Sequence, residues 1–147
     1  DIKIAFTEDE SKMGMYHEMM VGKKVWAVIG ATPNPEKISN KIYHTLKEHG
    51  YETYVVNPKY EEMDDGSKIY ASLEDLPKVP DCVDFVVPPA VTMDNLNAMN
   101  PQVYPCIWLQ PGTYNDDIVK FAEEKGFTVV HEGACVMAYL RINGSRC

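Results

Sequence analysis

Short apolar runs alternate with longer amphipathic segments along most of the chain. Five runs rich in Val, Ile and aromatic residues are typical of buried strands, and they lie at 25–29, 53–57, 82–87, 104–109 and 127–131. Continuous apolar runs of this kind indicate parallel strands whose two faces are both covered by helices. Strands separated by helical patterns favour a sheet built from right-handed crossovers. We therefore expect an α/β protein with a three-layer αβα fold and a five-stranded parallel sheet.

Helical periodicity marks the segments between these runs. Over 36–49, Ile38, Ile42 and Leu46 recur on one face, and Gly50 stands just past the end, where glycine commonly ends a helix. The segment 115–125 repeats this arrangement and is followed by glycine. Weaker patterns predict a helical turn over 72–77 and helices over 91–99, 133–140 and 8–20. We expect an N-terminal helical extension, residues 1–22, and one domain over residues 23–147.

The composition describes an acidic globular chain. Its 147 residues suit one domain, and 45% of them are hydrophobic while 24% are charged. A formal net charge of -8 argues against general nucleic-acid binding, which depends on Lys and Arg neutralising phosphates. No apolar run approaches the roughly 20 residues that span a bilayer. The first residues lack the basic segment and apolar core of a signal peptide. We expect a cytoplasmic protein that binds neither nucleic acid nor membranes.

Sulfur-containing residues add little to this description. The four cysteines form no Cys-x-x-Cys pair, so neither a zinc site nor a disulfide framework is indicated. A cluster of methionines near the N-terminus is consistent with a homodimer or partner contact, and equally with packing on the chain's own core. These are Met13, Met15, Met19 and Met20.

The first apolar run leads through a glycine turn into a helix. Gly30 lets the backbone turn sharply and approach a ligand closely, and the helix that follows directs free N–H groups at an anion. Ligands of open parallel sheets bind beyond the carboxyl ends of the strands. The candidate binding turns are therefore 30–32, 57–59, 87–89, 110–112 and 131–135.

An apolar strand that ends in a glycine turn before a helix is typical of nucleotide-binding α/β domains. The first two turns indicate which nucleotide this chain would bind. The first lacks the later glycines of a Gly-x-Gly-x-x-Gly fingerprint, and no Asp or Glu ends the second run to hold a ribose hydroxyl. Lys59 suits a phosphate on the ribose, as in NADP or coenzyme A (CoA), although it is also consistent with a solvated loop. Lys37, Thr32 and Ser39 suit a pyrophosphate at the helix start, where Thr32 is also consistent with a simple cap.

Five sequence blocks in this order resemble the small stand-alone CoA-binding proteins, which are similar to the N-terminal domain of the succinyl-CoA synthetase α subunit. The blocks are GATPNPEKIS (30–39), YVVNPKY (54–60), YASLEDLP (70–77), VDFVVP (83–88) and IWLQPG (107–112). The resemblance runs from about residue 23 to residue 141 and implies a Rossmann-like fold that binds CoA or an acyl-CoA.

The resemblance also implies a set of binding residues. The phosphates would be met by Gly30, Thr32, Lys37 and Ser39. The ribose 3′-phosphate region would be met by Asn57, Pro58 and Lys59, and the adenine side by Val87 and Pro88. The turns at the ends of the strands add Ala31, Gln110 and Gly112 as candidate binding residues. The family's cysteine matches Cys135, a candidate for a mixed disulfide with CoA if it begins a helix, because that setting lowers a thiol pKa. The residue before Pro88 and the segment 137–139 depart from the family pattern.

No catalytic constellation is readable in the sequence. Paired carboxylates, a Ser-His-Asp set and metal-ligand spacings are all missing, and a single histidine at the rim, His131, has no placed partner. We therefore expect a non-catalytic carrier, sensor or regulator. Two alternatives stay open, namely an NADP-linked oxidoreductase and an interaction module with a vestigial nucleotide pocket.

Overall fold

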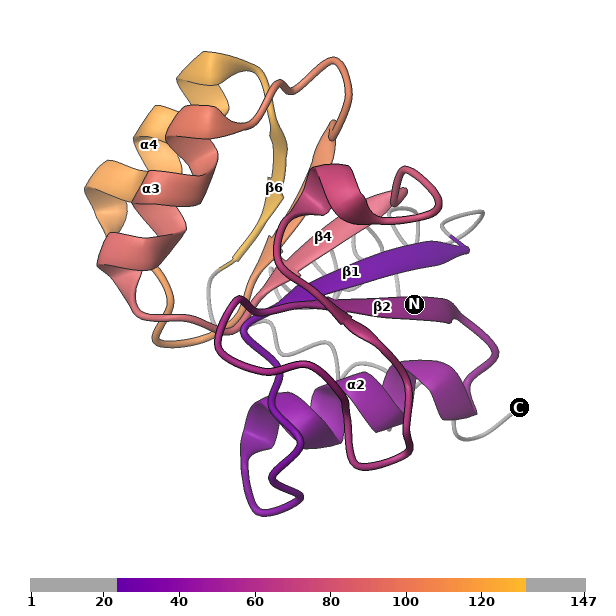
Figure 1. Cartoon of the computed structure of the whole chain (residues 1–147). Helices are drawn as coiled ribbons and strands as arrows, with labels where there is room; N and C mark the ends of the chain where they lie inside the picture. Colours follow the sequence, from indigo (N-terminus) through magenta and orange to yellow (C-terminus); the bar gives the residue numbers. More distant parts are fainter. Residues whose placement is uncertain (1–23, 132–147) are drawn as a thin grey trace, which may run out of the picture.

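A six-stranded parallel sheet runs through the part of the chain that the structure describes, residues 24–131 of a computed structural model (Figure 1). Its strands in chain order are β1 (Val25–Ile29), β2 (Glu52–Val56), β3 (Ile69–Tyr70), β4 (Cys82–Phe85), β5 (Cys106–Leu109) and β6 (Thr128–Val130). Their order across the sheet is β3-β2-β1-β4-β5-β6. The chain moves outward from β1 to β3 and then returns to the other side of β1. The strand order therefore reverses between β1 and β4, where such sheets bind ligands.

The predicted count of five strands is wrong by one. The strand that was not predicted is β3, in which Ile69 pairs with Val55 of β2 and Tyr70 pairs with Val56. Two residues are too few to show a strand periodicity, and they follow a polar stretch that resembles a loop. The backbone N–H of Asn57 extends the pairing by donating to the Tyr70 carbonyl at 2.8 Å.

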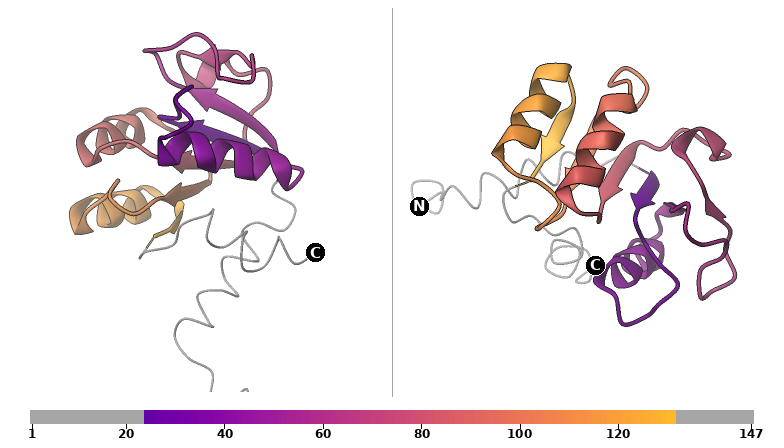
Figure 2. Two further views of the ribbon diagram at one scale, coloured as in Figure 1. Left: turned by 90° about the horizontal axis from the view of Figure 1, so that it is seen from below. Right: turned by 60° about the vertical axis from the view of Figure 1, so that its left-hand side comes forward.

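Helices cover both faces of the sheet, as the three-layer prediction requires (Figure 2). They are α2 (Ile38–Glu48), α3 (Pro89–Ala98) and α4 (Asp116–Lys125), and a 3₁₀ turn, η1 (Leu73–Asp75), follows β3. Alternate residues of β1 serve the two faces. Trp26 and Val28 pack in the same cluster as residues of α2, whereas Ala27 and Ile29 pack in the cluster that holds residues of α3 and α4. The α/β Rossmann-like fold is confirmed.

The N-termini of α4 and α2 differ in whether a side chain caps the helix. The side chain of Asn115 caps α4 by accepting a hydrogen bond from the Ile118 N–H at 2.9 Å. No side chain caps α2, whose first turn also holds no acidic residue. The first N–H groups of a helix have no partner within it, so the start of α2 keeps its partial positive charge available.

Several predictions fall on other parts of the chain. The N-terminal extension with its helix, the helix over 133–140 and Cys135 lie outside the described residues. Within residues 24–131 no helix has the length and hydropathy needed to cross a membrane.

Candidate functional site

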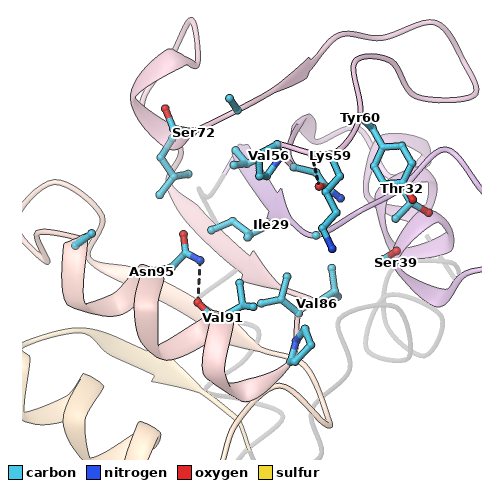
Figure 3. Close-up of a pocket in the computed structure, with 18 of the residues that line it drawn as sticks. Ile29, Thr32, Ser39, Val56, Lys59, Tyr60, Ser72, Val86, Val91 and Asn95 are labelled. Carbon is cyan, nitrogen blue, oxygen red and sulfur yellow. Dashed lines mark hydrogen bonds between the residues drawn. The ribbon is translucent and has the colours of Figure 1, made fainter.

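A cavity of about 800 Å³ opens beyond the carboxyl ends of β1 and β2, at the point where the strand order reverses (Figure 3). Nine of the twelve predicted binding residues line it, namely Gly30, Thr32, Lys37, Ser39, Asn57, Pro58, Lys59, Val87 and Pro88. The cavity brings together four segments that are far apart in the sequence, which are the turns after β1, β2 and β4 and the region around η1. Its volume lies within the usual range for small-molecule sites.

Three predicted residues lie away from the cavity lining. Ala31 is fully buried in the core beneath α2. Gln110 is also buried, and its Nε2 donates to Oδ1 of Asp84 at 2.6 Å. Gly112 occupies an exposed turn with a φ of 89°. Each therefore has a structural role near the rim without facing the cavity.

Gly30 lies at a close crossing of two chain segments in the cavity wall. Its φ is 105°, and a Cβ built on it would lie 2.5 Å from Cγ1 of Val87 and 2.7 Å from the Val86 carbonyl oxygen. Its own N–H donates to the Val56 carbonyl at 3.0 Å. A glycine is thus required where the turn after β1 crosses the chain that leaves β4, while its predicted close approach to a ligand stays a prediction. The crossing forms part of the cavity wall.

One wall of the cavity is built by the start of α2. The loop before the helix is held by two hydrogen bonds between residues two apart, from the Asn34 N–H to Oγ1 of Thr32 at 3.3 Å and from the Glu36 N–H to Oδ1 of Asn34 at 2.9 Å. Lys37 takes the N-cap position, where a cation is unfavourable for the helix dipole. Together with the hydroxyls of Thr32 and Ser39, this wall offers donors and positive charge to an anion.

A second wall comes from the turn after β2. Asn57 is buried there, and its Nδ2 donates to the Ala31 carbonyl at 3.1 Å while its Oδ1 accepts from the Lys59 N–H at 3.0 Å. These bonds hold the turns after β1 and β2 against each other. In Figure 3 the side chain of Lys59 points into the cavity from this turn. The lysine therefore adds a second cation to the one at the start of α2.

The remaining part of the cavity, which we call the apolar arm, lies between α3 and η1. Its lining is Val56, Ala71, Ser72, Leu73, Glu74, Val91, Asn95, Ala98 and Met99. None of these residues is among the binding residues predicted from the sequence. The spacing of Val91, Asn95 and Ala98, which places them on one face of α3, was the available signal. This arm offers a planar apolar ligand a surface that the cationic walls lack.

The one fully buried carboxyl group among residues 24–131 lies away from the cavity lining. Asp84 is fully buried in β4, where it is in register with Val28 and Trp108. Both of these residues belong to the core cluster that includes residues of α2. Burial raises the pKa of Asp84 well above the usual range, although the hydrogen bond from Gln110 opposes this shift. Among the described residues, no group donates a hydrogen bond to its Oδ2. Across residues 24–131, no group of three or more His, Cys, Asp or Glu side chains is arranged to hold a metal ion.

The chain is similar in sequence to part of a CoA ligase and to most of a small uncharacterized protein. The ADP-forming acetate–CoA ligase I of Archaeoglobus fulgidus is 39% identical over 71 residues, which cover 48% of this chain and 10% of the ligase. The match thus spans only about a tenth of that enzyme's length. The uncharacterized protein YneT of Bacillus subtilis is 28% identical over 117 residues, covering 77% of this chain and 83% of YneT.

A solved structure of similar size extends the comparison to the fold. The hypothetical protein from Pyrococcus horikoshii OT3 is 35% identical and superimposes with a TM-score of 0.80, covering 88% of this chain and 90% of that one. A family profile described as CoA binding domain matches residues 24–141. The resemblance to small CoA-binding proteins is confirmed, and this chain belongs to the CoA-binding domain family.

Proposed function

We propose that this chain binds CoA or an acyl-CoA in the cavity beyond β1 and β2, as a non-catalytic carrier, sensor or regulator. The observation that carries the proposal is the joining of three features in one cavity, namely the uncapped start of α2, the side chains of Lys37 and Lys59, and the apolar arm. CoA has matching parts, because a pyrophosphate and a ribose 3′-phosphate accompany its adenine.

In this proposal Lys59 determines which nucleotide binds, because it contacts the phosphate on the ribose. The Asn57 hydrogen bonds fix the backbone from which Lys59 reaches into the cavity, at the end of the strand that meets a nucleotide's ribose in this class of fold. A lysine at that position attracts a phosphate attached to the ribose. Family membership and the CoA ligases among the relatives support the same reading.

The test is a thermal-melting screen followed by calorimetric titration with CoA, dephospho-CoA, acetyl-CoA and NADP. A ligand at 100 times its dissociation constant stabilises the folded state by about 2.7 kcal/mol, which melting detects. Lys59→Ala is expected to weaken CoA about tenfold or more and dephospho-CoA much less, because only CoA carries the 3′-phosphate. Lys120→Ala removes an exposed lysine of α4 outside the cavity and is the matched control.

Each alternative gives a different result in this screen. Stabilisation by NADP and none by CoA would favour a redox enzyme, and no shift with any nucleotide would favour an interaction module with a vestigial pocket. Equal losses of CoA and dephospho-CoA in Lys59→Ala would show that this lysine does not read the 3′-phosphate.

A further inference from the structure

The apolar arm contains one side chain whose polar atoms match the edge of a purine base. Val91, Asn95 and Ala98 form its α3 wall, and Leu73 lies among the residues of the facing wall. Asn95 carries the only amide side chain among the residues of this arm. An aromatic base placed here would have apolar surface on its faces, so that hydrogen bonds at its edge would fall to the few polar groups nearby.

The orientation of the Asn95 amide is set by its own helix. Its Nδ2 donates to the Val91 carbonyl one turn earlier at 2.9 Å (Figure 3). Because a carbonyl accepts only from a donor, the amino group must face Val91, and Oδ1 must face away from it. No protein donor to this Oδ1 occurs among the hydrogen bonds found within residues 24–131. The amide therefore presents an acceptor and one remaining N–H to a ligand.

The other polar side chains of the arm are less suited to this task. The Ser72 hydroxyl, on the opposite side of the cavity in Figure 3, already donates to Oδ2 of Asp75 at 3.0 Å. Glu74 is exposed at the rim, where its carboxylate is hydrated and would repel the phosphates of a nucleotide. Since the Ser72 hydroxyl can still accept but not donate, Asn95 is left as the uncharged side chain of the arm that offers a base edge both an acceptor and a donor.

We propose that Asn95 is a specificity-determining residue that selects a 6-aminopurine in the apolar arm. Oδ1 accepts a hydrogen bond from the exocyclic amine of adenine, and the free N–H of Nδ2 donates to a ring nitrogen beside it, the pairing by which asparagine recognises adenine elsewhere. A 6-oxopurine presents an acceptor in place of the amine, so its oxygen faces Oδ1 and is rejected. This inference rests on the proposed binding of CoA and adds the reason for choosing its base.

The experiment compares CoA with deamino-CoA, in which hypoxanthine replaces adenine and nothing else changes. Calorimetric titration of the wild-type chain is expected to favour CoA by about tenfold or more, the range of a bidentate contact to a base. Asn95→Leu keeps a side chain of similar size but removes both polar atoms, and is expected to bring the two affinities to within about twofold, mainly by weakening CoA. Asn97→Leu makes the same change on an exposed position of α3 outside the cavity and should keep the wild-type preference.

The possible results distinguish the role of Asn95 from the proposed binding of CoA. A wild-type chain that binds neither ligand would refute the proposed function itself. A chain that binds CoA but shows no preference over deamino-CoA, or an Asn95→Leu variant that keeps the full preference, would overturn the role of Asn95 alone. If Glu74→Gln abolished the preference for CoA over deamino-CoA while Asn95→Leu kept it, the Glu74 carboxylate would be the group that recognises the base.

Discussion

Replacing Gly30 with alanine tests the crossing between the turn after β1 and the chain that leaves β4. The φ of 105° disfavours any residue with a Cβ, at a cost of about 1–2 kcal/mol. The new Cβ would also lie 2.7 Å from the Val86 carbonyl oxygen and 2.5 Å from Cγ1 of Val87. The Val87 methyl can rotate away, but the carbonyl belongs to the backbone beside β4, so relief requires that segment to shift. Overpacking of this kind costs about 1–3 kcal/mol. Gly30→Ala should therefore destabilise the fold by about 2–5 kcal/mol.

A matched control separates the two contributions. Gly66 has a φ of 86°, and a Cβ added to it would meet nothing within 4 Å. Gly66→Ala should therefore show the conformational cost alone, about 1–2 kcal/mol. Urea unfolding followed by circular dichroism measures both variants against the wild-type chain, provided that the denaturant slope is unchanged. If Gly30→Ala cost no more than Gly66→Ala, the proposed close approach to Val86 would be refuted.

Two further predictions concern carboxylates whose pKa values move in opposite directions. Asp84 is buried with a raised pKa, so above the unfolded value of about 3.9 the folded state keeps a proton that the unfolded state loses, and stability falls as pH rises. Asp84→Asn should remove this slope, and stability curves that stay parallel to the wild type from about pH 4 to pH 7 would contradict it. Burial opposes ionisation of Asp65 as well, but hydrogen bonds from Lys47 and Ser67 hold its pKa below the usual range. The stabilisation from the ionised Asp65 carboxylate is fully present above the unfolded pKa of about 3.9 and declines as the pH falls below it. Asp65→Asn should therefore be most destabilising near pH 6 and progressively less destabilising below about pH 4, as measured by urea unfolding.

The local pattern was sufficient for the elements with strong periodicity. β1 has the predicted bounds, Val25–Ile29, because five consecutive apolar residues before a glycine turn need no distant partner to be read as a buried strand. The stop of α4 was likewise readable, since Gly126 adopts a left-handed conformation just past the helix. The ends of the longer runs were less certain. Val86 and Val87 continue the apolar run of β4 but leave the sheet and line the cavity.

Within the candidate site, the sequence by itself determined which turns carry the charged and hydroxyl side chains that now line the cavity. Lys37, Ser39 and Lys59 could be chosen because parallel strands bring their carboxyl ends to one edge, whatever the details of packing. The assignment of phosphate contacts to them stays a prediction.

Only the tertiary structure decided which of the neighbouring residues face the cavity and what lies opposite them. Ala31 follows Gly30 directly yet lies in the core, because the turn at Gly30 brings it into the cluster that includes residues of α2. β3 exists only through its pairing with β2, and the apolar arm exists only because α3 and η1, far apart along the chain, come together across the same opening. A pattern in the sequence records the environment of each residue along its own element, whereas a cavity depends on contacts between elements that no local pattern specifies.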